Sequence, residues 1–145
     1  MSMKFNNKQM LANLHEDADF AEWYVEDFMK KNLQNYYFAI SDEGKREMVI
    51  NGRNYARRFG FNNPEWQFHF VTLMWKVAAN FWQFPGFKEI AEDQKTSEEE
   101  RIDQFYNVSK DLAVEAIMNP DERFWYPEIV DVLKRKHPHE LRFKD

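Results

Sequence analysis

The four histidines are the first residues to consider for chemistry, because imidazole both ligates metals and carries protons. A metal-binding helix needs a second ligand three or four residues along, and Thr72 and Leu73 stand at those positions after His69. We therefore expect His69 to be a buried, hydrogen-bonded structural residue. His137 and His139 could chelate a metal loosely, but they stand in a basic stretch that we read as exposed. The sequence predicts no metal site and no bound cofactor.

Other catalytic groups lack the context that their chemistry needs. The chain has no cysteine, so disulfides, zinc–thiolate sites and thiol nucleophiles are excluded. Its serines stand in no nucleophile elbow, and no Glu-x-x-His motif, P-loop or dinucleotide fingerprint occurs. Acid–base work needs recessed carboxylates, whereas the acids here fall mostly on exposed faces or at helix starts. We predict that the protein is not an enzyme; the alternative is an unrecognised enzyme that uses His69 with a nearby carboxylate.

Charge is distributed unevenly along the chain, which favours a protein partner. Residues 89–103 hold seven acids against two bases, and residues 134–144 hold five bases against one acid. An acidic region can attract a cationic partner, although charged runs are more often solvated helix faces. The acidic residues that we select as candidate partner-binding residues are Glu92, Asp93, Glu98, Glu99, Glu100 and Asp103.

Adjacent aromatic residues supply a second candidate contact. Arg123 is followed by Phe124, Trp125 and Tyr126, shortly after a helix break at Pro120. Adjacent side chains cannot all face one core, so at least one of these aromatics is available as an anchor in an interface. The alternative is that all three seal the end of the fold. We select all four residues as candidate partner-binding residues.

Composition bounds the class of protein. The chain has 145 residues, 17% of them aromatic, with four Gly and five Pro, which suits one domain of long helices with an aromatic core. A net charge of −5 disfavours nucleic-acid binding. We expect no signal peptide, because the first twenty residues lack a continuous apolar segment, and no membrane span, because no apolar run reaches about 20 residues. The lack of cysteine suits the cytoplasm.

The fold is expected to centre on residues 64–87, which contain eight aromatic residues. Asn63 can cap a helix that begins at Pro64. Apolar residues cover this helix nearly all round, which is typical of the central helix of a globule. Pro85 then forbids further helix. We predict an all-α protein, a single-domain helical bundle of about five to seven helices around a central aromatic-rich helix at 64–82.

The remaining helices are expected to surround the central one within a single domain, residues 1–145. Periodicity and capping residues predict helices at 4–14, 17–40, 41–60, 87–91, 97–118 and 127–136. Tyr36, Tyr37 and Phe38 either continue the second helix or leave it in an extended turn. The compact aromatic corner Trp82–Phe87 is expected in the core.

Two of these helices carry further detail. Ser97 and Glu100 form a capping box at the start of the helix that reaches Met118. The residues that should face inward in it are Ile102, Phe105, Tyr106, Leu112, Ala113, Ala116 and Ile117.

Between Ser41 and Gly60, four arginines form an expected basic outer face: Arg46, Arg53, Arg57 and Arg58. One interpretation is that these guanidinium groups clamp a carboxylate or a phosphate. The other, which we favour, is that they are solvated or paired with the acidic stretch 89–103.

Four short motifs resemble those of small helical bacterial proteins encoded beside spike, tip or toxin components of type VI secretion systems. The motifs are YARRFGF at 55–61, FVTLMW at 70–75, NF at 80–81 with Pro85, and ERI at 100–102 followed by FY at 105–106. The similarity covers roughly residues 45–117. This chain has Ala79-Asn80 where that group often has a Gly-Pro or Gly-x pair, and the matched positions are mainly structural, so no catalytic residue carries over.

The resemblance implies a cytoplasmic accessory protein of an antibacterial secretion locus. The first hypothesis is an immunity protein that binds and neutralises a cognate toxin, with the acidic stretch on a basic toxin cleft. The second is an adaptor or chaperone that loads an effector onto the spike. An immunity protein protects cells that express the toxin, whereas an adaptor is needed for secretion and gives no protection. The sequence leaves the oligomeric state open.

Overall fold

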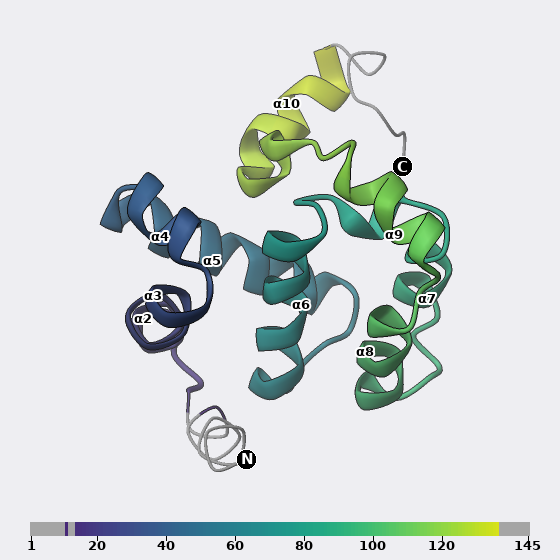
Figure 1. Ribbon diagram of the computed structural model, residues 1–145, viewed down its shortest axis with the longest axis horizontal. Coiled ribbons are helices and arrows are strands. Elements are labelled where there is room, and N and C mark those ends of the chain that lie inside the picture. The colour runs from purple at the N-terminus through teal and green to yellow at the C-terminus, as the bar shows by residue number, and fades with distance from the viewer. Residues whose placement is uncertain (1–10, 12–13, 137–145) are drawn as a thin grey trace. The chain divides into compact units, whose positions relative to one another are not determined.

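The computed structural model describes residue 11 and residues 14–136, and every element of regular structure in that part of the chain is a helix (Figure 1). This confirms the all-α prediction. The contacts divide the chain into two compact units, Met1–Val71 and Thr72–Asp145. One domain over residues 1–145 therefore stays a prediction.

Two expectations concern residues outside the described part. The predicted helix at 4–14 falls almost wholly there, and His137 and His139 fall there entirely.

In the first unit, the helix predicted at 17–40 is a series of helical segments. They are α2 (Asp17–Trp23), the π-helix η1 (Tyr24–Met29), α3 (Lys30–Asn32) and α4 (Gln34–Ala39). Leu33, at φ −132° and ψ 52°, separates the last two. Just before it, Asn32 Nδ2 donates to Phe28 O at 3.0 Å, and such a bond gives the backbone an alternative to the next helical turn. Tyr36, Tyr37 and Phe38 are helical.

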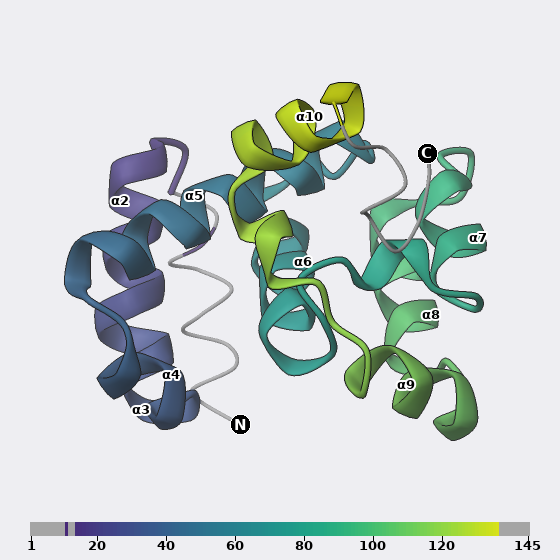
Figure 2. The same ribbon diagram turned by 90° about the horizontal axis from the view of Figure 1, so that it is seen from above.

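Helix α5 (Asp42–Arg58) confirms the helix predicted between Ser41 and Gly60. Ser41 Oγ accepts a hydrogen bond from Gly44 N at 3.0 Å. Gly60 has φ 86°, the left-handed conformation that ends many helices and that glycine adopts without strain. Helices α2 and α5 pack side by side (Figure 2).

Aromatic rings fill the core of the first unit. Phe28 of η1 and Phe68 of α6 (Pro64–Lys76) lie with ring centroids 4.7 Å apart, and the Tyr24 ring is 5.1 Å from the first and 5.6 Å from the second. Phe20 and Tyr24 are fully buried. Burial of such large rings supplies much of the apolar stabilisation.

Helix α6 begins as predicted and ends earlier than predicted. Glu65 N donates to Asn63 Oδ1 at 2.9 Å, so Asn63 caps it. The helix ends at Lys76 instead of near residue 82, and the boundary between the two units falls within it, after Val71.

Asn80 gives the physical reason for the early end. Its buried side chain accepts from Asp121 N at 2.9 Å and donates to Gln83 Oε1 at 3.3 Å. The bond from Asp121 N holds Asn80 where its own backbone, at φ −114° and ψ 37°, is not helical. Phe81–Gln83 then form the 3₁₀-helix η2.

The described part of the second unit, residues 72–136, contains the end of α6, η2 and five further helices. They are α7 (Lys88–Glu92), α8 (Glu98–Tyr106), α9 (Lys110–Ile117), the 3₁₀-helix η3 (Glu122–Trp125) and α10 (Pro127–Lys136). The helix predicted at 127–136 is confirmed. The corner Trp82–Phe87 agrees with its core interpretation, because Phe84 and Phe87 are buried. The Phe87 ring lies 6.3 Å from that of Phe105.

The prediction of one helix at 97–118 is wrong, because the chain turns between α8 and α9. Asn107 Nδ2 donates to Asp103 O at 2.8 Å, which satisfies a carbonyl at the end of α8. Ser109, at φ −57° and ψ 148°, then starts α9. The turn changes which side chains of the second helix face inward.

Candidate partner-binding surface

The acidic residues selected from the sequence lie on α7, on α8 and in the loop between them. Glu92 and Asp93 are exposed where α7 ends. On α8, Glu99, Glu100 and Asp103 are exposed. Glu98 is half-buried at the start of α8. We call the exposed residues Glu92, Glu99, Glu100 and Asp103 the acidic surface.

Arg101 is a basic residue of the same stretch, and it is buried. Its side chain is 1% exposed, and Nη2 donates to Ala91 O at 3.5 Å, which links α8 to α7. Burial lowers the pKa of the Arg101 guanidinium, while the negative charges of Glu98 and Asp93 oppose that shift. Glu98, which is half-buried, and Asp93, which is exposed, thus favour the charged form of a buried cation. The other selected acids are exposed.

Asp93 has a structural role in the loop between α7 and α8. Its carboxylate accepts from Thr96 Oγ1 at 2.7 Å and from Lys95 N at 3.3 Å. The hydrogen bond from the Thr96 hydroxyl is the main cause that lowers the pKa of Asp93. A partner that used this carboxylate would have to compete with both bonds.

The start of α8 concentrates negative charge. Ser97 Oγ accepts from Glu100 N at 3.2 Å, which is the first bond of the predicted capping box. Three glutamates fill the first turn, where backbone N–H groups make the helix end positive and favour carboxylates. The glutamates that stabilise the start of α8 therefore also give this part of the surface its negative charge.

The four residues selected around η3 separate into a buried pair and a half-buried pair. Phe124 and Trp125 are buried, and the Trp125 ring lies 4.2 Å from that of Trp75. For these two, the structure agrees with the alternative that they seal the fold. Arg123 and Tyr126 are half-buried, so contact with a partner stays a prediction for them.

Asp121 orders the segment that carries Arg123. Arg123 Nη2 and Nε donate to the two Asp121 carboxylate oxygens at 2.8 and 2.9 Å, a bidentate pair of the strong kind. Burial alone would raise the pKa of Asp121, but the hydrogen bonds and charge of Arg123 outweigh burial and lower it.

A surface that the sequence analysis missed lies on α9. Ala116 is its only buried residue, whereas Val114, Ile117 and Met118 are exposed, the last beyond the end of the helix. The prediction that Tyr106, Leu112 and Ile117 face inward is wrong, because all three are exposed. The available signal was local: Asn107 and Ser109 are helix-end and helix-start residues in the middle of the supposed helix.

The arginines of α5 are not a common outer face. Arg53 is 2% exposed. Arg57 Nη2 lies 2.8 Å from Asp17 Oδ1, and Arg46 Nη2 lies 3.1 Å from Glu26 Oε2. Arg58 is exposed, so the favoured interpretation, that these cations are solvated or paired, agrees with the structure, and the printed partners are acids of the first unit.

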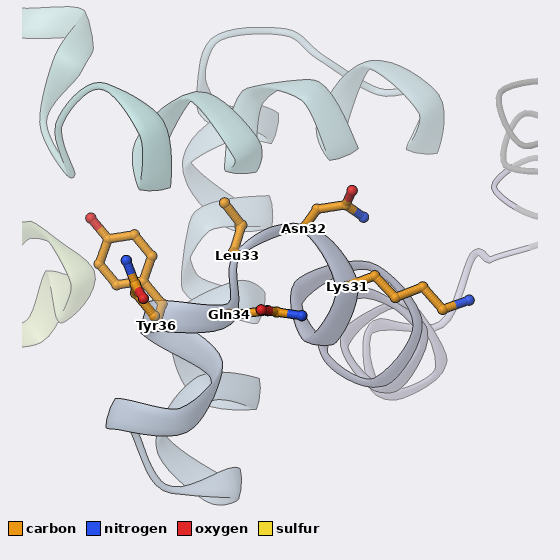
Figure 3. A pocket seen from close by; sticks show the side chains of 6 residues that line it. Lys31, Asn32, Leu33, Gln34 and Tyr36 are labelled. Carbon is orange, nitrogen blue, oxygen red and sulfur yellow. The ribbon is translucent and has the colours of Figure 1, made fainter.

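The first unit has a hollow of about 340 Å³ at the break between α3 and α4 (Figure 3). Its lining is Lys31, Asn32, Leu33, Gln34, Asn35 and Tyr36. The lining side chains contain one cation and three amides. They can exchange hydrogen bonds with a polar ligand, but they supply no carboxylate or imidazole for proton transfer.

His69 lies between aromatic neighbours in the first unit. Its ring is half-buried, 5.9 Å from that of Trp66 and 5.0 Å from that of Phe68. This agrees with a structural role, although burial is less complete than expected. Within residues 14–136, no group of His, Asp and Glu residues is arranged to hold a metal ion.

Comparison with protein-family models, with curated proteins and with solved structures finds no match to this chain. Across the described helices, none combines the length and apolar character that crossing a membrane requires.

Proposed function

We propose that this chain is a cytoplasmic protein-binding module, namely an immunity protein that neutralises a cognate type VI secretion toxin by covering a basic surface. The observation that carries the proposal is the acidic surface: Glu99, Glu100 and Asp103 face solvent on one helix while Arg101 is buried. Such a surface speeds association with a basic partner and disfavours acidic ones. The motifs at 55–106 that resemble secretion-associated proteins support the choice of partner.

Protein binding also suits the chemistry of the described residues better than catalysis does. The selected acids are exposed or compensate a buried cation, and none is paired with a second carboxylate in a recess where their pKa values would differ. We propose that the protein is not an enzyme.

Partner capture followed by a toxicity assay tests the proposal. The tagged chain is used to isolate partners from its native host, and each partner is identified by mass spectrometry and then expressed alone and with this chain. An immunity protein restores growth. A partner that is not toxic, or is toxic with no protection, contradicts immunity; secretion that depends on the chain would then indicate the adaptor alternative.

The electrostatic part of the proposal has its own test, with variants chosen from the structure. Glu98 is left intact because its charge compensates Arg101. The combined variant Glu99→Gln, Glu100→Gln, Asp103→Asn should lower the association rate constant for the toxin by about tenfold at low salt. It should also reduce the dependence of that rate on salt.

A matched control removes the same charge from the other unit. Glu22, Asp27 and Glu47 are exposed there, and their change to Gln, Asn and Gln should leave the association rate nearly unchanged. Equal rates for both triple variants would contradict a role for the acidic surface.

A further inference from the structure

Helix α9 presents an apolar face to solvent. Val114 and Ile117 are each 45% exposed, and Met118, just after the helix, is 71% exposed. Their spacing of i, i+3 and i+4 places the three side chains on one side of a helix. We call these three residues the α9 face. Large apolar side chains that gather on a surface mark an interaction site more often than isolated ones do.

The opposite side of α9 fixes the helix to its own unit. Ala116 is buried. Leu112 packs against Gly86, where an added Cβ would lie 2.7 Å from Leu112 Cδ1, and Gly86 has φ +93°. Leu112, although 36% exposed, and Ala116 are one turn apart on the side of the helix that contacts the rest of the unit, and the α9 face lies on the other side.

Negative charge borders the α9 face. Asp111 and Glu115 are exposed on α9, and they follow Met118 around the helix at successive helical positions. Lys110 lies on the apolar side, one turn before Val114. Only Asn107–Ser109 separate α9 from α8 with its acidic surface. The surroundings of the α9 face are therefore acidic on balance.

We propose that the α9 face binds an amphipathic helix of a partner protein whose apolar stripe is flanked by Lys and Arg. The inference rests on the proposed protein-binding function and names the element of the partner that is recognised. Three apolar side chains at helical spacing match the anchors of a packed helix, and the acidic border matches the basic flanks. A second copy of this chain fits less well, because two α9 faces would bring acidic borders together.

The interaction divides the work between two features. The α9 face supplies apolar burial, which holds the complex together, and the acidic surface supplies attraction over distance. Substitutions in the α9 face should therefore raise the dissociation rate, while neutralised acids should lower the association rate.

A designed peptide tests the inference without the natural partner. The probe is a fluorescent helix of about 18 residues with Leu at positions that form one stripe and Lys elsewhere; its control carries Glu in place of Lys. Binding to the full chain is measured by fluorescence anisotropy. We expect the Lys peptide to bind at least about tenfold more tightly than the Glu peptide, since the latter faces like charge.

Variants of the chain locate the binding. The combined change Ile117→Asp and Met118→Asp should weaken binding of the Lys peptide by about tenfold or more, although the two added negative charges by themselves would attract that peptide. The matched control is Phe38→Asp with Tyr36→Asp, which alters exposed aromatics of the first unit, 75% and 42% exposed, and adds the same charge. Equal affinity of the two double variants would overturn the inference.

Further outcomes separate this inference from the proposed function. If the α9 double variant, shown folded by circular dichroism, still binds the identified toxin with unchanged dissociation rate, the inference is overturned and the immunity proposal stands. If the wild-type chain gives no protection, the immunity proposal fails and the peptide result alone decides the inference. Sedimentation that shows a dimer lost in the α9 double variant would replace the partner helix by a second copy.

Discussion

Arg53 contributes to stability through an unusually complete set of partners for a buried cation. Nε donates to Gln67 Oε1 at 2.7 Å, Nη2 donates to Leu14 O at 2.7 Å, and Nη1 lies 3.2 Å from Asp17 Oδ1. The guanidinium carbon also lies 4.3 Å from the centre of the Phe20 ring. Burial lowers the pKa of Arg53 most, and Asp17 opposes that shift. A buried charge is tolerated only with such compensation.

Removing this side chain should be costly. Arg53→Met leaves buried acceptors unpaired, and we expect the free energy of unfolding to fall by about 3 kcal/mol, measured by urea denaturation. Arg58→Met is the control, because Arg58 is exposed with its guanidinium 5.0 Å from the Tyr55 ring; it should cost less than about 1 kcal/mol. Similar losses for the two variants would show that the buried network does not stabilise the first unit.

Asp121 should make stability depend on pH in the acid range. Its pKa in the folded protein is lowered from the ordinary value of 3.8, so the folded state favours the charged form. The resulting stabilisation is present above pH 3.8 and is lost as the pH falls through the lower folded pKa.

The variant Asp121→Asn isolates that contribution. It should lower the free energy of unfolding near pH 7 by about 1–3 kcal/mol, because the bond pair with Arg123 is lost. The difference from wild type should shrink as the pH falls below 3.8. Urea denaturation at a series of pH values measures this. A difference that stays constant down to pH 2 would mean that Asp121 acts through packing instead of charge.

Helices α8 and α9 show how similar sequence signals differ in effect. Each follows a serine with extended backbone, Ser97 and Ser109. Ser97 Oγ accepts from Glu100 N at 3.2 Å, whereas Ser109 makes no such capping bond. A side-chain cap satisfies one N–H group that the helix leaves unpaired.

The two serines therefore form a matched pair of substitutions. Ser97→Ala should lower the free energy of unfolding by about 1 kcal/mol, and Ser109→Ala should lower it by only about 0.3 kcal/mol. Thermal or urea denaturation of both variants gives the comparison. If Ser109→Ala proved as destabilising as Ser97→Ala, Ser109 would also have to cap its helix in solution.

At the scale of the whole molecule, the net charge of −5 hides a sharper local pattern. In the first unit, Arg46 and Arg57 are paired with Glu26 and Asp17. In the second unit, Arg101 is buried, whereas the residues of the acidic surface are exposed. The surface potential relevant to a partner is thus more uneven than the sum of charges, and pairing geometry is the reason.

The sequence by itself determined the helical class, most helix starts and the aromatic content of the core. These depend on short-range physics: Ser41, Asn63 and Ser97 accept bonds from residues two or three positions away. The apolar repeat of Phe20 and Tyr24 likewise follows from helical spacing alone. Such features can be predicted because the interacting groups are neighbours in the chain.

Tertiary structure decided what depends on distant partners. Asn80, four residues after the end of α6, accepts a hydrogen bond from Asp121 N at 2.9 Å, and Arg53 is buried where Gln67 Oε1 and Leu14 O accept its hydrogen bonds. The outward α9 face arose because the turn after α8 and the contact at Gly86 reoriented the helix. Spacing within one segment carries no information on these partners, so only the packed chain could assign them.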